Sequence, residues 1–473
     1  MRDQGSLQGI IQSQCLALFY DVFAKALFDS ELPVCIIGAG ASGLSAAHSL
    51  EALGRSTVIF EQRDTVGGYA QNYYENGLPF HLGPILIQNG SHPETIKIVN
   101  DVGVLTTTYT AASAWFFNWT TGETWALPPA EPSPDLLEEV VRYTAHWQKI
   151  YGSFAQSAYT ENVPEELTLS TYEWFSRYNY PLLQARFTRY IIDWGYGDVD
   201  ELPIFYMLSV FAPTSIGATP LRVDYHEVFQ RYARQLTAST ILLRSKITAI
   251  DRTTDIVTIH YHYDAAQHEQ PCSHLIIAFA PTLLTLSTAG LDLSPAEETV
   301  FSAVQTTNYF STAIRLSNTP RLAEFNIATD SAFSFPEIAG QPVYIEGEYN
   351  SSDVSLLYAL GREDQSPEQV AAVTLQTLSR INGDPQVAAT GEGEESRTPM
   401  TLPVEPRDIK ALRQHPHYFP HFNQSALRGG WYDMFNALQG GNRTFYTSGL
   451  NRAEHVEYVI VSAREVVERF LGS

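Results

Sequence analysis

The sequence contains few cysteines, and none of them form the close pairs that thiol redox centres and zinc sites use. Its 473 residues include only Cys15, Cys35 and Cys272, and no two have the CxxC spacing. Three cysteines cannot build a multi-disulfide framework, and a dithiol oxidoreductase needs the CxxC pair. Cys35 lies in a short apolar run, so we expect it to pack as an inert side chain in a buried strand.

Positive charge is also scarce. The chain has 29 Lys and Arg against 52 Asp and Glu, a formal net charge of −23 at pH 7. Such acidity argues against nucleic acids and anionic membrane surfaces as partners. The chain has no HExxH motif, so we expect no metal site, and it has no GxSxG motif of a hydrolase nucleophile.

No apolar run is long enough for stable insertion into a membrane. Residues 10–28 are rich in apolar side chains, but Asp21 and Lys25 interrupt them, whereas a spanning helix needs about 20 mostly apolar residues. We expect residues 1–32 to be an N-terminal extension, either an amphipathic helix packed on the body or a degenerate targeting segment. We favour a cytoplasmic location and leave the secretory pathway open, because N-x-[ST] sequons are present.

The stretch from residue 34 to residue 69 has the pattern of a dinucleotide-binding unit. The apolar run Val34–Ile37 predicts a buried parallel strand, which leads into a GxGxxG motif formed by Gly38, Gly40 and Gly43. These glycines permit a tight turn, a close approach of the backbone to a pyrophosphate, and close helix–strand packing. Glu61 follows Gly38 by 23 residues, near the spacing of about 20 expected for a carboxylate on a ribose hydroxyl. A tight turn without a ligand is the alternative interpretation.

The residues that follow this unit indicate which dinucleotide binds. Residues 61–68 form the pattern E-x-R-D-x-x-G-G, which resembles the flavin-containing amine oxidase superfamily. The resemblance implies FAD as the cofactor, with Glu61 on the adenosine ribose, Arg63 near the phosphates and ribityl chain, and the glycine pair close to the cofactor. The family usually has Arg or Lys after this pair, where the present chain has Tyr69.

The same resemblance assigns further segments to the flavin. The segment HLGPILI, residues 81–87, matches a run along the flavin ring, with a simple loop as the alternative. Ile247 matches a residue whose backbone meets the adenine. Gly449 and Val456 match the strand, turn and helix that close the site, although Leu450 stands where the family has Glu. The predicted cofactor-binding residues are Gly38, Gly40, Ala41, Ser42, Gly43, Glu61, Gln62, Arg63, Gly67, Gly68, Tyr69, Gly83, Pro84, Ile85, Ile247, Gly449 and Val456.

The glycine motif predicts an α/β fold with a Rossmann-like FAD-binding domain, and the resemblance to amine oxidases implies an interleaved α+β substrate domain and a helical cap. We assign residues 33–110, 220–305 and 425–473 to the FAD-binding domain, and residues 111–219 and 306–424 to the substrate and cap domain.

Two segments narrow the resemblance. Residues 193–208 and 418–446 resemble the polyunsaturated fatty acid double-bond isomerases, and the chain is also similar to fungal oxidocyclases that dehydrogenate β-cyclopiazonate. Residues 171–211 are dense in aromatic side chains, which suits either a cap that lines an apolar cavity or an aromatic core.

The resemblance implies an FAD-dependent oxidoreductase, and three functions stay open. The first is an oxidase or dehydrogenase that takes a hydride from an apolar or aromatic small molecule, such as a secondary metabolite, with oxygen reoxidising the flavin. The second is a redox-neutral isomerase of an unsaturated fatty acid. The third is a flavin-binding protein without chemistry.

The candidate catalytic residues are Tyr196, in a GYG turn, and His455, in the first turn of the last helix, which we predict over residues 454–471. Core packing and a solvated helix turn are their respective alternatives. Tyr418 and Trp431 are the candidate rings to face the flavin. Arg222 and Arg428 are candidates to anchor a fatty acid carboxylate, with a structural or surface role as the alternative for each.

Overall fold

The computed structural model describes residues 32–109, 113–126, 133–216, 218–252, 255–317, 323–327, 339–382 and 402–472. The predicted N-terminal extension lies almost wholly outside this part of the chain, so both interpretations of it stay predictions. Among the helices of the described residues, none is long and apolar enough to cross a membrane.

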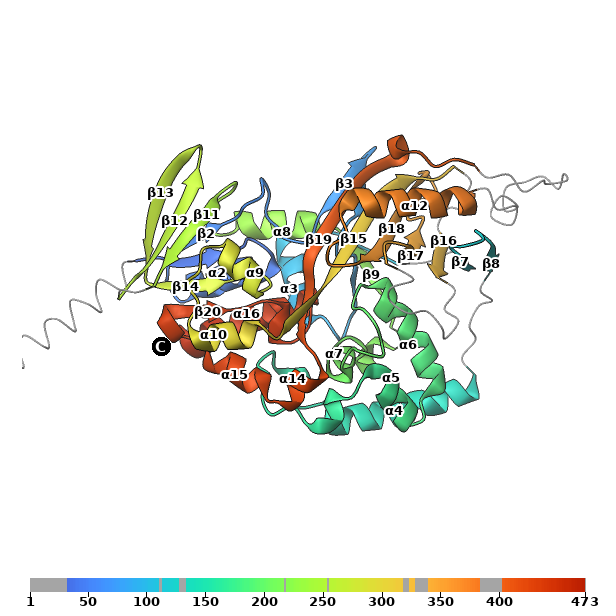
Figure 1. Cartoon of the computed structure of the whole chain (residues 1–473), viewed down its shortest axis with the longest axis horizontal. Coiled ribbons are helices and arrows are strands. Elements are labelled where there is room, and N and C mark those ends of the chain that lie inside the picture. Colours follow the sequence, from blue (N-terminus) through green and yellow to red (C-terminus); the bar gives the residue numbers. More distant parts are fainter. Residues whose placement is uncertain are drawn as a thin grey trace, which may run out of the picture.

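The glycine motif follows the central strand, β1, of a five-stranded parallel sheet with the order β10–β2–β1–β14–β20, on the left in Figure 1. Every residue of β1 and β2 is buried, which explains their uninterrupted apolar sequences. Segments far apart in the chain therefore build one sheet. Its strands are β1 (Val34–Ile37), β2 (Thr57–Phe60), β10 (Ser239–Leu242), β14 (His274–Ile277) and β20 (Thr444–Tyr446).

Two long helices, α2 (Ala41–Ala52) and α16 (Val456–Phe470), pack against each other beside this sheet. The Ser42 hydroxyl, at the start of α2, donates to the carbonyl of Thr447, which follows β20, at 3.0 Å. The turns that enter both helices thus meet at the carboxyl edge of the sheet, where parallel sheets bind ligands. Helix α3 (Pro93–Val102) contacts α16, and α8 (Tyr225–Arg234) contacts both α2 and α3.

The prediction that Cys35 packs as an inert side chain is wrong. The Sγ atom of Cys35 is bonded to that of Cys272, and the two Cα atoms are 5.7 Å apart. The sheet order explains the pairing, because β14 lies beside β1 and begins two residues after Cys272. A separation of 237 residues hides this contact from the sequence.

A seven-stranded, mainly antiparallel sheet with the order β19–β15–β18–β17–β16–β7–β8 forms the right half of the view, with α12 (Pro367–Asn382) alongside it in Figure 1. The paired strands β15 and β19 are the longest and run toward the centre of the molecule. The strands are β7 (Ser113–Phe117), β8 (Thr124–Ala126), β15 (Val304–Arg315), β16 (Ala323–Ile327), β17 (Pro342–Glu346), β18 (Val354–Gly361) and β19 (Ile409–Phe422).

Four helices gather below this sheet in Figure 1 and make contact with it through α6. They are α4 (Pro134–Ile150), α5 (Thr171–Arg177), α6 (Pro181–Asp193) and α7 (Ile204–Val210). Many of their rings are buried against one another: Trp174 and Phe175 are inaccessible to solvent, and Phe187 stacks on Phe211 with ring centroids 4.1 Å apart. The aromatic segment 171–211 is therefore helical, and much of it is core.

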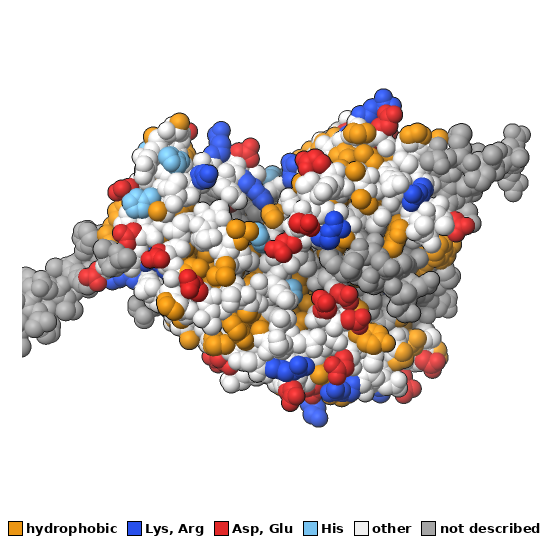
Figure 2. Space-filling view, viewed as in Figure 1, with side chains coloured by type: hydrophobic (Ala, Val, Ile, Leu, Met, Phe, Trp, Pro, Cys, Tyr) orange, Lys and Arg blue, Asp and Glu red, His pale blue; other side chains and the backbone are white. Residues whose placement is uncertain are grey.

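The antiparallel sheet β11–β12–β13 projects at the upper left, and the surface is hollowed between this projection and the rest of the molecule (Figure 2). Acidic and basic side chains are interspersed on the face shown. The remaining elements are β3 (Asn72–Glu75), β4 (Leu78–His81), β5 (Leu86–Ile87), β6 (Thr106–Thr108), β9 (Leu221–Val223), β11 (Lys246–Asp251), β12 (Val257–Tyr263), β13 (Ala266–Cys272), α9 (Leu283–Thr288), α10 (Pro295–Phe301), α14 (Gln424–Arg428) and α15 (Trp431–Ala437), with short 3₁₀ turns between.

Candidate cofactor and substrate site

The glycine motif has the geometry that its spacing predicts. Gly38 adopts a φ of +107°, which favours glycine, and a Cβ atom on Gly43 would lie 1.9 Å from the Gly38 carbonyl oxygen. Gly40 and Gly68 approach so closely that a Cβ atom on Gly68 would lie 3.0 Å from the Gly40 Cα. The two glycine-rich loops therefore meet backbone to backbone.

Among the described residues, no side chain caps the first turn of α2, whose N-cap is Gly40. Free N–H groups and the partial positive charge of the helix end suit phosphate groups. Ala41 begins this turn, and Ser42 is held by Thr447. The uncapped turn and the cradle of glycines fit the pyrophosphate of a dinucleotide.

Glu61 is buried at the end of β2 and faces the glycine turn. Its Oε2 accepts a hydrogen bond from the Ala39 N–H at 3.0 Å, and its Oε1 accepts one from the Arg63 N–H at 2.9 Å. The Arg63 guanidinium donates to the Gly68 carbonyl at 2.5 Å. Gln62, between them, is exposed. Glu61 and Arg63 thus join the two glycine loops.

Ile247 lies near the same turn through a backbone connection. The N–H groups of Arg244 and Ser245 donate to the carbonyls of Arg63 and Glu61, at 2.8 and 2.9 Å. Ile247 follows two residues later at the start of β11 and is nearly buried. This arrangement is compatible with the predicted adenine contact, which stays a prediction.

The segment that contains Gly83, Pro84 and Ile85 packs against the second glycine loop. A Cβ atom on Gly83 would lie 1.9 Å from the Tyr69 carbonyl oxygen, so only glycine fits there. The Ile85 carbonyl accepts a hydrogen bond from the Val223 N–H at 3.0 Å. All three residues of the segment are partly accessible, as a segment that borders a ligand site requires.

The turn before α16 contains Leu450, at the position where the resembled family has Glu. Leu450 is fully buried and therefore replaces Glu as a core residue. A Cβ atom on Gly449 would instead lie 2.2 Å from Oε2 of Glu454. Glu454 thus brings a carboxyl group against Gly449 from the turn that precedes α16, and Val456 is the first residue of this helix.

Four tyrosines, Tyr69, Tyr196, Tyr309 and Tyr418, form what we call the tyrosine cluster. The Tyr418 ring is central: its centroid is 5.7 Å from that of Tyr69, 6.3 Å from that of Tyr196 and 5.2 Å from that of Tyr309. These rings come from a loop beside the glycines, from the cap and from β15 and β19. The cluster therefore spans from the glycine loops to the seven-stranded sheet.

Three hydroxyls of the cluster donate hydrogen bonds to backbone carbonyls. Tyr69 donates to Pro416, Tyr196 to Glu454 and Tyr309 to Asp193. Burial, with the nearby carboxyl group of Glu454 as the next cause, raises the pKa of Tyr196. The hydroxyls are thus occupied and protonated, and the cluster contributes ring surface more than polar groups.

His455 lies close to Tyr196 in the chain's fold, because the Tyr196 hydroxyl donates to the backbone carbonyl of Glu454, which directly precedes His455. The Nε2 atoms of His455 and His92 are 3.0 Å apart. Burial lowers the pKa of His92 to about 4, and burial, with His92 and Arg452 as further causes, lowers the pKa of His455 well below its usual value. Both imidazoles are therefore neutral at pH 7.

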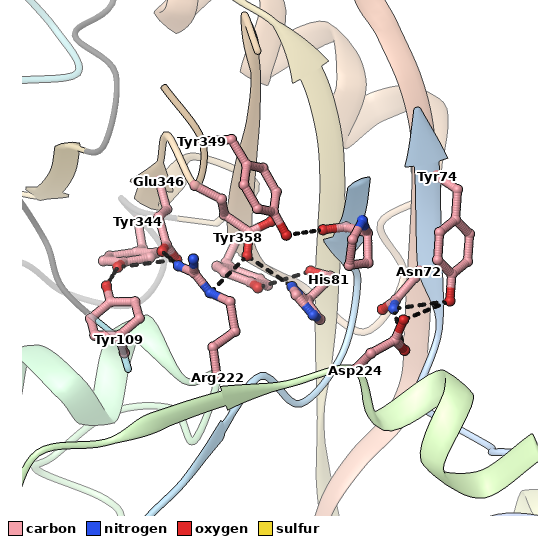
Figure 3. A network of polar contacts seen from close by, with 12 residues as sticks. Asn72, Tyr74, His81, Tyr109, Arg222, Asp224, Tyr344, Glu346, Tyr349 and Tyr358 are labelled. Carbon is pink, nitrogen blue, oxygen red and sulfur yellow. Dashed lines mark hydrogen bonds and ion pairs between the residues drawn. The ribbon is translucent and has the colours of Figure 1, made fainter. Parts of the chain in front are cut away.

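The two arginines that were candidate carboxylate anchors differ in their surroundings. Arg222 lies between two buried glutamates, with Nη2 2.6 Å from Oε1 of Glu346 and Nε 3.3 Å from Oε1 of Glu348. Figure 3 shows its guanidinium near Glu346, with Tyr109 and Tyr344 on one side. Arg428 is an exposed residue whose Nε donates to the Thr168 hydroxyl. The contacts of Arg222 agree with a structural role, and the role of Arg428 stays a prediction.

The Arg222 network also joins the two halves of the fold. His81, at the end of β4, is 2.8 Å from Glu348 through Nδ1, and its carbonyl accepts a hydrogen bond from Tyr358 of β18 (Figure 3). Burial, with Glu348 as the next cause, raises the pKa of Glu346 above its usual value. One cation, Arg222, thus lies against two buried carboxyl groups.

Sequence reasoning missed Glu454 and His92. Glu454 had a local signal, since it is a carboxylate at the start of the predicted last helix, four residues after Leu450. His92 had none, because its partner His455 is 363 residues away.

The comparisons with known proteins agree with this geometry. The profile of flavin containing amine oxidoreductases matches residues 41–397, and the chain belongs to this family. β-Cyclopiazonate dehydrogenase of Aspergillus flavus is 22% identical over 459 residues, which cover 93% of each chain. The FAD-dependent oxidoreductase oblC of Cochliobolus heterostrophus is 21% identical and covers 88% of this chain and 86% of its own.

The fold has a counterpart among solved structures. The crystal structure of a CLA-producing fatty acid isomerase from P. acnes matches with a TM-score of 0.74 at 21% identity, over 93% of this chain and 99% of that one. The predictions of an amine-oxidase-like fold, an FAD cofactor and an oxidoreductase are thereby confirmed. The roles of the individual residues toward FAD stay predictions.

Proposed function

We propose that this FAD-dependent oxidoreductase takes a hydride from a C–H bond of a neutral, apolar or aromatic small molecule and passes the electrons to oxygen. The observation that carries the proposal is the tyrosine cluster, which joins the glycine loops to the seven-stranded sheet. Tyr196 and Tyr309 are buried, whereas Tyr69 and Tyr418 are partly accessible. Three of the four hydroxyls are bound to backbone carbonyls, so the accessible part of the cluster is mainly ring surface. Aromatic surface suits a ring or an unsaturated chain more than a charged group.

The reaction balances as follows. The substrate loses a hydride from carbon and a proton from a neighbouring atom, and oxygen takes two electrons and two protons to form hydrogen peroxide. Bound FAD supplies the hydride acceptor. The chain supplies orientation, exclusion of water and a proton acceptor.

We assign the proton acceptor to the carboxyl group of Glu454. Within the described residues this group makes no hydrogen bond and no ion pair, and its charge acts on Tyr69, Tyr196 and Tyr418. Burial raises the pKa of Glu454 to about 7. A carboxyl group of this pKa exchanges protons readily near neutral pH, as a general base must.

A fatty acid isomerase is the second candidate, and the solved fatty acid isomerase of similar fold favours it. In that reaction the hydride returns to another carbon of the substrate, and no oxygen is consumed. The ion pairs of Arg222 with Glu346 and Glu348 argue against it, because they occupy one of the two arginines that we considered as carboxylate anchors.

An anaerobic titration followed by air distinguishes these functions. The purified holoenzyme is mixed with candidate substrates, an unsaturated fatty acid and polycyclic aromatic compounds, and its visible spectrum is recorded. Lasting bleaching that air reverses, with stoichiometric peroxide, is expected. Turnover with oxidised flavin and no oxygen uptake would establish the isomerase instead. A colourless protein that takes up no FAD would contradict both.

A further inference from the structure

Two helix N-termini meet at the His92–His455 pair. His92 directly precedes α3, and His455 directly precedes α16. The carboxylate of Glu457, in the first turn of α16, accepts hydrogen bonds from the N–H groups of Glu94 and Thr95 at 3.1 and 2.8 Å. The N-terminus of α3 is thus satisfied by Glu457, whereas no side chain of the part of the chain that the structure describes caps α16.

The hydrogen bonds around His92 determine where its proton lies. The Gln88 N–H donates to Nδ1 of His92 at 3.3 Å, and the Ser91 hydroxyl lies 2.8 Å from the same atom. Nδ1 is therefore an acceptor, and a neutral His92 carries its proton on Nε2. That proton faces Nε2 of His455, which must accept it.

The tautomer of His455 follows. A neutral imidazole that accepts through Nε2 carries its proton on Nδ1. The Nδ1 atom of His455 is buried and has no hydrogen-bond partner among the described residues. Buried donors are normally satisfied, so a donor left over beside a ligand site indicates an acceptor on the ligand.

The surroundings of this donor favour an electron-rich acceptor. The uncapped N-terminus of α16 carries partial positive charge. The buried guanidinium of Arg452 lies close enough to lower the pKa of His455. On the other side, Thr447 connects this turn to Ser42 at the start of α2, where the phosphates are predicted.

We propose that His455 donates a hydrogen bond from Nδ1 to the edge of the bound flavin ring that gains negative charge on reduction, and that His92 is the positioning residue that holds His455 in the required tautomer. The inference rests on the proposed function only in requiring FAD at this site. It involves no substrate.

The test uses the full-length holoenzyme without substrate and measures the reduction potential of the flavin. His455→Ala should disfavour reduction about tenfold, because a hydrogen bond to a charged acceptor is lost. For a two-electron couple this is a shift of about 30 mV to more negative potential. His455→Asn keeps a donor near the Nδ1 position and should restore most of the shift.

His92 has its own matched pair of variants. His92→Leu removes the donor to His455 and should give a smaller shift in the same direction, whereas His92→Gln keeps an N–H and should resemble the wild type. Nitrogen-15 NMR of the imidazoles should show the Nδ1-protonated tautomer of His455 in the wild type and a mixture in His92→Leu. His262→Ala, on the exposed face of β12, is the control and should change neither.

An unchanged potential in His455→Ala with FAD bound would overturn the inference, as would an Nε2-protonated His455 in the wild type. If His455→Ala binds FAD weakly, His455→Asn must recover binding, and failure to do so would also overturn it. These results leave turnover by the wild type intact. A wild type that binds no FAD would instead overturn the proposed function, and this inference with it.

Discussion

The hydroxyl of Tyr196 donates a hydrogen bond to the backbone carbonyl of Glu454 at 3.0 Å, although 258 residues separate them. Glu454 in turn places its carboxyl group against Gly449. The contact joins the helical cap to the turn that leads into α16. It therefore positions the tyrosine cluster relative to the predicted flavin site.

Replacing Tyr196 by Phe removes this contact and keeps the ring. We expect kcat/KM to fall about fivefold, since a hydrogen bond contributes about 1 kcal/mol. The flavin spectrum should not change. Steady-state kinetics with the substrate identified by the anaerobic titration measure the effect, and Tyr172→Phe, on an exposed tyrosine, is the control. If the variant is less stable but keeps its full kcat/KM, Tyr196 contributes to packing and not to the reaction.

Glu454→Gln tests the proton acceptor through pH dependence. The pKa of Glu454 is raised to about 7 in the folded protein, so ionising it there is costly. The resulting loss in the free energy of unfolding is absent near pH 4, grows between about pH 4.5 and 7, and is complete above pH 7. We expect Glu454→Gln to stabilise the protein by about 1–3 kcal/mol at pH 8 and to leave it unchanged at pH 4.

The same variant should lose activity. The wild-type rate is expected to rise with pH through about 7 as Glu454 becomes a base, and Glu454→Gln should lack this limb. Thermal melts and pH–rate profiles measure the two effects, with Glu468→Gln as an exposed control. If the variant has normal activity and an unchanged pH–rate profile, Glu454 is not the proton acceptor.

Glu61→Gln tests the cofactor site independently of the reaction with substrate. The neutral amide keeps the size of Glu61 but loses the charged acceptor intended for the ribose. We expect the dissociation constant of FAD to rise about 10- to 100-fold. Titration of the FAD-free protein, followed by flavin fluorescence, measures it. Glu298→Gln, on the surface, should bind FAD normally; equal affinity in Glu61→Gln would contradict the assignment.

Arg222→Met tests the buried network. The variant leaves the carboxyl groups of Glu346 and Glu348 without their cation. Breaking a buried pair from one side costs about 3–5 kcal/mol, and we expect a loss of this size in the free energy of unfolding. Arg177→Ala breaks an exposed pair with Glu173 and should cost less than about 0.5 kcal/mol. Similar losses in both variants would show that the network contributes little.

The sequence by itself determined the parts of this protein whose residues are neighbours in the chain. The GxGxxG turn, Glu61 and the second glycine pair lie within a single strand–helix–strand unit, and each depends on local backbone requirements such as the positive φ of Gly38. From them the FAD cofactor, the amine-oxidase-like fold and the oxidoreductase class were predicted and confirmed.

Only the tertiary structure decided which distant residues meet. The prediction for Cys35 was wrong because the order of the parallel sheet brings β14 beside β1. His92 and His455 form a pair only because α3 packs on α16, and four separate segments contribute the rings of the tyrosine cluster. Burial, which shifts the pKa of Glu454, is likewise a property of the packed molecule and leaves no mark on the sequence around it.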